Sequence, residues 1–250
     1  MRLTLLLVTC LMLVNMVLAQ DEEPIASSQP SPLATLGKLG PIKGVLGTVA
    51  DIDVPEGVWF IARDKVPQFL TLTENLARGT EIGALVAEDW WAVFEFDDCG
   101  YVKDEEKNKH DADDLLDSLK ESNEGGNKVR KERGWKPVIL EGWMKKPYFD
   151  DLTKNLTWAT IVSGDGGKAI NHDIRLLGRR GVIQATLVVD PEKYAASVAS
   201  FDQCIAGVSF KSGQTYSEFR PGDKMAKYGL AALVAGGGIA IAAKTGLLAK

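Results

Sequence analysis

Stretches in which apolar and polar residues alternate predict a series of β-strands, separated by turns rich in glycine, proline and aspartate. The clearest strand covers residues 90–96, which are mostly aromatic or β-branched and run into turn residues 97–100. Further strands are predicted at residues 49–54, 58–61, 138–143, 156–162, 169–177, 181–189 and 205–210. Because short connections join the strands of the second half, the pattern predicts a largely antiparallel sheet.

The chain is organised around one of these connections, the hairpin at residues 172–183. Two apolar runs meet there at the turn Gly178-Arg179-Arg180-Gly181, whose glycines allow a tight reversal. Residues 163–167, with the sequence Ser-Gly-Asp-Gly-Gly, predict a second hairpin loop just before it. The two loops together predict three consecutive strands that lie side by side.

Helical periodicity appears in three places. Residues 64–75 carry an apolar face, and a longer helix capped by Asp111 or Asp113 runs to about residue 129. Gly125-Gly126 lies within the longer helix and costs roughly 2 kcal/mol relative to two alanines, so a kink or break is predicted there. A third helix, residues 191–200, starts at a proline, which suits a first turn. The elements predict an α+β fold in which helices flank the sheet.

The first 19 residues have the pattern of a secretory signal peptide. Arg2 precedes an apolar stretch that ends at the small-residue cleavage site Val17-Leu18-Ala19. The alternative is an uncleaved membrane anchor. Residues 20–47 contain several prolines together with serine and glycine, and they predict a flexible linker. The ordered domain is then expected to cover residues 48–222.

The last apolar stretch predicts a transmembrane helix at residues 226–248. Residues 229–243 carry no charge, but a helix of that length reaches only about 22 Å, so a full span must continue past Lys244 to cross a hydrocarbon core of about 30 Å. The flanking lysines favour a cytoplasmic C-terminal tail. The alternative is a glycine-rich helix buried in the core of the domain.

Composition and charge limit the partners. The chain has 250 residues and a formal net charge of −5, and 45% of its residues are hydrophobic, enough for a sizeable core. Residues 20–223 hold 24 Lys and Arg against 34 Asp and Glu, a net of −10. An acidic surface of this kind repels phosphates, which argues against nucleic acid as a partner.

Cleavage of the signal leaves two cysteines, Cys99 and Cys204. In an oxidising compartment they can form one disulfide, and closing a loop of roughly 100 residues is worth about 4–5 kcal/mol in the loop-entropy model. Two unpaired, buried thiols are the alternative. The chain has no Cys-x-x-Cys pair.

Few side chains support catalysis. Of the two histidines, His110 lies in a charged stretch and His172 in a predicted strand, where a structural role is expected. They lack metal-ligand spacing, so no metal site and no cofactor is predicted. Arg175, Arg179 and Arg180 are the best candidates for binding an anionic ligand, because a guanidinium group pairs well with carboxylate or phosphate. The alternative is that these arginines pair with nearby acids of the chain.

Several motifs resemble a family of bacterial membrane-anchored proteins known as domain of unknown function 2167. They lie, in order, at residues 54–57, 98–104, 142–143, 147–150, 156–159, 171–181 and 228–237. The resemblance implies an exported domain with a C-terminal membrane segment, and it implies no activity. The order of the predicted elements also resembles the PsbP-like α/β/α sandwich, a likeness of architecture that carries no function.

Two functions are compatible with the sequence. The first is a non-enzymatic binding or scaffolding module for an envelope protein or an anionic ligand. It would be held in the lipid bilayer of the bacterial inner membrane by its C-terminal helix, with the domain in the periplasm. The second is an envelope hydrolase or ligand-sensing enzyme that uses the acids at residues 97–104 together with His172 or Arg175. The missing catalytic set favours the first.

Overall fold

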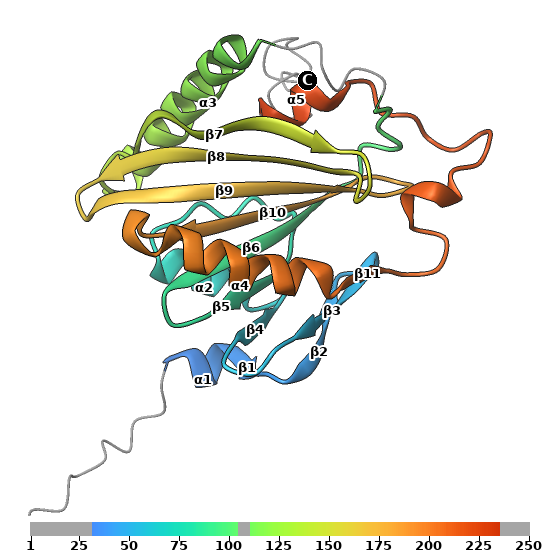
Figure 1. Cartoon of the computed structure of the whole chain (residues 1–250). Helices are drawn as coiled ribbons and strands as arrows, with labels where there is room; N and C mark the ends of the chain where they lie inside the picture. Colours follow the sequence, from blue (N-terminus) through green and yellow to red (C-terminus); the bar gives the residue numbers. More distant parts are fainter. Residues whose placement is uncertain (1–31, 105–110, 236–250) are drawn as a thin grey trace, which may run out of the picture. The chain divides into compact units, whose positions relative to one another are not determined.

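The computed structural model describes residues 32–104 and 111–235 (Figure 1). Its largest element is an eight-stranded sheet in the order β1-β4-β5-β6-β10-β9-β8-β7, in which every neighbouring pair is antiparallel. In that order the strands are Gly37–Leu39, Trp59–Ala62, Glu81–Val86, Trp90–Asp97, Val182–Val189, Gly167–Leu177, Asn155–Gly164 and Ile139–Asp150.

A second sheet has the order β11-β3-β2 and is formed by Val208–Phe210, Ala50–Val54 and Ile42–Leu46. The α-helices α1 to α5 are Pro32–Leu36, Val66–Leu72, Ala112–Glu132, Tyr194–Ala206 and Leu230–Val234, and the 3₁₀ turns η1 and η2 are Pro191–Lys193 and Tyr216–Glu218. The predicted α+β fold with a largely antiparallel sheet is confirmed.

Helices cover both faces of the large sheet. Side chains on a strand alternate between these two faces, so each face presents its own set of residues to the helices that lie on it. On β10, Ile183 and Leu187 are fully buried in the main core cluster, which also contains Phe201 of α4. Gln184 and Thr186, at the alternate positions, point to the opposite face, where α2 and α3 lie. Figure 1 shows α4 in front of the sheet and α2 behind it.

The predicted hairpin at residues 172–183 is confirmed. Strands β9 and β10 pair in continuous register from Leu177 opposite Val182 to Ile170 opposite Val189. Glycine is required at the end of the turn, since a Cβ on Gly181 would lie 2.1 Å from the backbone oxygen of Asp97. The second predicted hairpin loop also forms, between β8 and β9.

The prediction of a flexible linker at residues 20–47 is wrong for residues 32–47, the part that the structure describes. Residues 32–46 form α1, β1 and β2 almost without interruption. Leu36 and Leu46 from this segment are buried, the latter completely. Pro32 and Pro41 therefore mark a helix start and a turn rather than flexibility, because proline suits a first helical turn and the ends of edge strands. Residues 20–31 lie outside the described residues.

The predicted break at Gly125-Gly126 is absent, and α3 is continuous from Ala112 to Glu132. Two asparagines tie the helix to β7 around the glycines. Asn127 exchanges hydrogen bonds with the backbone of Val138 at 2.8 and 2.9 Å, and Asn123 accepts one from the Leu140 N–H. These tertiary contacts outweigh the low helix propensity of glycine. The predicted cap is confirmed, since Asp111 accepts a hydrogen bond from the Asp113 N–H.

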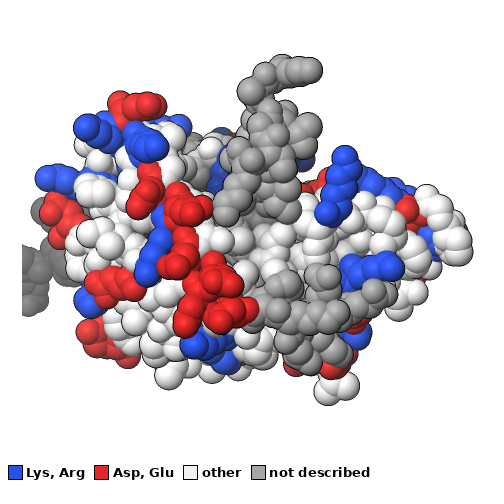
Figure 2. Space-filling model, turned by 90° about the horizontal axis from the view of Figure 1, so that it is seen from above, with Lys and Arg blue, Asp and Glu red and all other residues white. Residues whose placement is uncertain are grey.

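Helix α3 has no buried residue, although it is 21 residues long. Acidic residues occupy its first turn and basic residues its last turn, which suits the helix dipole. Figure 2 looks down on this part of the domain and shows an acidic patch with basic side chains around it. The helix is therefore mostly polar, and it packs on the domain through half-buried Leu115 and Leu119, which contact the cluster around Trp158.

The start of the predicted transmembrane segment belongs to the core of the domain. Leu230, Leu233 and Val234 of α5 are at most 2% exposed and pack in a cluster with Trp158 and Val182. Among the described residues, no helix has the length and apolar character needed to cross a bilayer. Residues 236–248 of the predicted anchor, the signal peptide at residues 1–19 and His110 lie outside the described residues.

Candidate functional site

A cavity of about 1060 Å³ lies on the face of the large sheet opposite α4. Strands β6, β10, β9 and β8 form its floor, residues 70–78 form one wall, and residues 119–130 of α3 form the other. The loop at residues 163–168 lies at the end of the floor strands. The cavity exists because α2 and α3 leave the central strands of this face uncovered, and its size suits a bound ligand.

The register of the sheet arranges polar floor residues in rows across the strands. One row runs from Glu95 to Gln184 and Arg175, and all three side chains line the cavity. The next row contains Thr186 and Asp173, followed by Trp158 and flanked by Val93. The floor is thus polar at its centre, with Trp158 at one side and both Val93 and Glu95 at the other.

Arg175 is the most unusual side chain of the floor. It is 6% exposed, its Nη1 donates to the Asp173 carboxylate at 3.2 Å, and its guanidinium carbon lies 4.5 Å from the Trp158 ring centroid. Burial lowers the pKa of Arg175, and the charge of Asp173 opposes that effect. Its Nε is buried and has no hydrogen-bond partner among the described residues. A buried donor without an acceptor costs about 1–3 kcal/mol.

The acids of the floor are already hydrogen-bonded. Asp173 accepts a second hydrogen bond from the Thr186 hydroxyl at 2.8 Å. Glu95 accepts one from Thr80 at 2.8 Å, and Arg78 lies 4.0 Å from its other oxygen. Glu81, 4% exposed, accepts from two backbone N–H groups of the preceding turn. The charges of the floor therefore compensate one another largely within the chain.

Of the four predicted ligand-binding residues, only Arg175 lines this cavity. His172 points to the opposite face, where its Nδ1 lies 2.9 Å from the Tyr194 hydroxyl. It is 3% exposed, and burial lowers its pKa, so the neutral form is favoured. This contact agrees with the structural role expected of His172.

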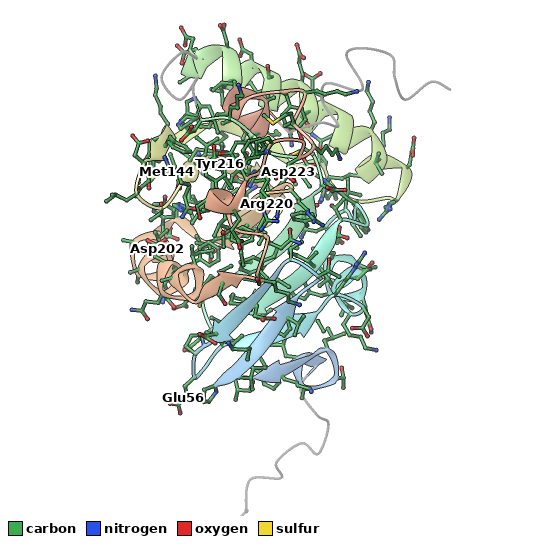
Figure 3. The ribbon with its side chains drawn as sticks, turned by 90° about the vertical axis from the view of Figure 1, so that its right-hand side faces the viewer. Glu56, Met144, Asp202, Tyr216, Arg220 and Asp223 are labelled. Carbon is green, nitrogen blue, oxygen red and sulfur yellow. The ribbon has the colours of Figure 1, made fainter. Side chains whose placement is uncertain are left out.

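Arg179 pairs with an acid that lies 44 residues away in sequence. Its Nε and Nη2 donate to the two carboxylate oxygens of Asp223 at 2.7 and 2.8 Å. These hydrogen bonds, together with one from the Arg220 N–H, lower the pKa of Asp223 to about 2. Figure 3 shows Asp223 and Arg220 on the segment that follows Tyr216. The Arg179–Asp223 pair thus holds this segment against the hairpin turn. The Arg180 side chain, in contrast, is exposed.

The acids at residues 97–104 are also engaged elsewhere, and none of them lines the cavity. The Tyr228 hydroxyl donates to Asp97, and Lys154 donates to Asp104 at 2.9 Å. The described residues contain no group of three or more His, Cys, Asp or Glu side chains placed to hold a metal ion. The groups that the enzymatic hypothesis requires are therefore not assembled in one site.

Sequence reasoning missed most of the residues around Arg175. The signal was nevertheless present, since Asn171, Asp173 and Arg175 occupy alternate positions of one predicted strand. Gln184 and Thr186 repeat the same pattern on the partner strand. Polar residues at every second position of two paired strands indicate a polar site on one face of the sheet.

Of the two alternatives for Cys99 and Cys204, the disulfide is not formed, and both cysteines are free. Cys204 lies on α4 in the main core cluster, whereas Cys99 packs against the cluster that contains Val102 and Leu233. Their places on opposite sides of the fold could not be deduced from their spacing. Burial raises the pKa of each thiol to about 11.

Both thiols should resist alkylation in the folded protein, because the thiolate is the reactive form and burial disfavours it. We expect iodoacetamide at pH 8 to modify Cys99 and Cys204 rapidly only after denaturation, with a slowing of at least tenfold in the native state. Mass spectrometry of non-reduced digests provides the check. A peptide pair joined through these two cysteines would contradict the expectation.

The fold and the cavity define an antiparallel α+β domain with a polar ligand-sized site. The chain belongs to the family described as "Protein of unknown function (DUF2167)", whose model matches residues 40–250. No curated protein matches the chain. The solution structure of cyanobacterial PsbP (CyanoP) from Synechocystis sp. PCC 6803 is similar over 71% of this chain and 99% of that chain, with 10% identity and a TM-score of 0.39.

Proposed function

We propose that the chain is a non-enzymatic binding module whose partner enters the cavity between the large sheet and helices α2 and α3. The observation that carries this proposal is Arg175, a buried cation that lines the cavity and whose Nε lacks an acceptor among the described residues. A partner that supplies an acceptor removes the cost of this unpaired donor. The acids beside Arg175 hold it in place.

We further propose that the partner is a protein of the bacterial cell envelope. The signal-like residues 1–19 support an exported domain. A protein partner is favoured over a small anion, because Arg175 already pairs with Asp173 and Arg179 with Asp223. The arginines of the hairpin therefore offer less positive charge than the sequence suggests.

Photo-crosslinking from the cavity tests this proposal. We expect a photoreactive benzoylphenylalanine at position 72 to give discrete protein adducts in intact bacteria, because Leu72 lines the cavity and is 64% exposed. Val45 provides the matched control, since it is 51% exposed but lies on β2 of the small sheet, away from the cavity. The adducts are read as shifted bands on immunoblots and identified by mass spectrometry.

Adducts from position 72 that are absent from position 45, and that are competed by excess wild-type chain, support a cavity-specific partner. Equal adducts from both positions would show non-specific encounter. Irradiation that yields no adduct from position 72, in cells that contain the folded protein, would contradict the proposal.

A further inference from the structure

The cavity has the length of a short extended chain. Arg175 and Ala169 both line it from the same face of β9 and lie six residues apart. At about 3.3 Å per residue, the floor between them is roughly 20 Å long. An extended peptide of about six or seven residues has the same length, since its rise per residue is also about 3.3 Å.

The charges around Arg175 favour an uncharged group there. Among the charged residues that line the cavity, those that act on Arg175 are two acids, Asp173 and Glu95, and one base, Arg78. Asp173 and Glu95 both act electrostatically on Arg175, so they lie close enough to affect any group that reaches it. A carboxylate or phosphate would meet their repulsion in a poorly solvated site, whereas a neutral carbonyl oxygen would not.

The aromatic side chains of the cavity favour a peptide over a sugar chain. Recognition of a sugar by stacking needs an open aromatic face. The Arg175 guanidinium already covers Trp158, and Trp91 is in edge contact with Phe69 at a centroid distance of 5.5 Å. Amide side chains on the floor, Asn171 and Gln184, offer both donors and acceptors, which match a peptide backbone.

A glycine pair in α3 supplies a second, independent observation. Gly126 lines the cavity, and a Cβ added to it would meet nothing within 4 Å. Glycine at position 126 weakens the helix relative to alanine, and no contact within the chain requires the absence of a side chain there. Glycine lets another backbone approach closely. Gly125 has the same free space around it but is exposed and does not line the cavity.

From these observations we infer that the cavity binds an extended, uncharged peptide segment of about six residues, that Arg175 donates to one of its carbonyl oxygens, and that its backbone passes beside Gly126. This inference rests on the proposed function and specifies the part of the partner that enters the site.

The test uses the purified full chain and a library of hexapeptides that are acetylated and amidated and contain only Ala, Val, Leu, Ser, Thr, Asn and Gln. Peptides retained by the protein are identified by mass spectrometry and resynthesised, and their Kd is measured by isothermal calorimetry. We expect Gly126→Leu to weaken binding at least tenfold because its side chain fills the cavity. Gly125→Leu, the matched control, should leave Kd within twofold.

Both leucine variants should melt at or above the temperature of the wild-type chain, because leucine is a better helix former than glycine. A weakened Gly126→Leu variant that melts normally therefore reports the cavity and not unfolding. In a retained peptide, glutamate then replaces one glutamine at a time. The variant whose glutamate lies nearest Arg175 should bind at least tenfold more weakly than the parent peptide.

Three outcomes would overturn the inference. The first is equal binding by the Gly126→Leu and Gly125→Leu variants. The second is that each glutamate variant, whatever the position of the glutamate, binds more tightly than the parent peptide. The third is retention of no peptide. If adducts from position 72 persist while no peptide binds, the peptide class is wrong and the binding function stands; if those adducts are also absent, both fail.

Discussion

A chain trimmed to residues 48–222, the domain predicted from the sequence, should fail to fold, whereas residues 32–235 should fold cooperatively. The shorter chain lacks β1 and β2, which pair with β4 and β3. It also lacks Asp223, the partner of Arg179, and helix α5. The loss therefore affects the edge of each sheet and residues of all three hydrophobic clusters at the same time.

The size of the effect follows from four buried side chains that the shorter chain lacks. Leu46, Leu230, Leu233 and Val234 are each at most 2% exposed. Burying an aliphatic side chain of this size contributes about 1.5–3 kcal/mol, so the four together contribute roughly 6–12 kcal/mol as an upper estimate. The entire free energy of unfolding of a domain is commonly about 5–15 kcal/mol. Their removal is expected to abolish most of the stability.

Urea denaturation followed by tryptophan fluorescence gives the measurement. Residues 32–235 should show one sigmoidal transition, and residues 48–222 should show none or aggregate. Within the longer chain, Leu233→Asp should reproduce the loss, because it places a charge among apolar residues. Leu72→Asp, at an exposed position, should change the midpoint little. A shared transition midpoint for the two chain lengths would show that the terminal elements contribute nothing.

The strands that the sequence predicted well are those rich in aromatic and β-branched residues or joined by short turns. The strand at residues 90–96 and the hairpin at residues 172–183 appear as expected, because turn residues mark where each strand ends. Strand β5, Glu81–Val86, was missed because its residues are buried on both faces and show no alternation. Helix α4 extends to Ala206, so the strand predicted at residues 205–210 is shorter, Val208–Phe210.

The candidate site was predictable only in part. The sequence identifies Arg175 as a candidate for ligand binding. That Arg175 lines the cavity and Arg179 does not depends on contacts with residues far away in the chain. Asp223 meets Arg179 across 44 residues, and such a pairing leaves no local pattern. The cavity itself arises where α2 and α3 fail to meet over the sheet, a matter of helix placement that periodicity does not encode. The same holds for the separation of the two cysteines.

Arg175→Met should destabilise the domain by about 3–5 kcal/mol, the usual effect of removing one partner from a buried ion pair. Asp173, which is 9% exposed, would remain at the floor of the cavity with the Thr186 hydroxyl but without its counter-charge. Adding Asp173→Asn removes the uncompensated charge. The double variant should therefore recover most of the lost stability, because a buried ion pair adds little net stability over neutral residues of similar size.

The free energies of unfolding of the wild-type chain, both single variants and the double variant complete a thermodynamic cycle. We expect the double variant to be more stable than Arg175→Met alone by at least 1 kcal/mol, and to have lost binding to the crosslinking partner despite being folded. That combination separates the two roles of Arg175, since stability depends on the charge balance with Asp173 whereas binding depends on the donor at Nε. A double variant that folds and still binds would show that the unpaired donor has no part in recognition. A strictly additive cycle would show that the 3.2 Å contact between Arg175 and Asp173 contributes no coupling energy.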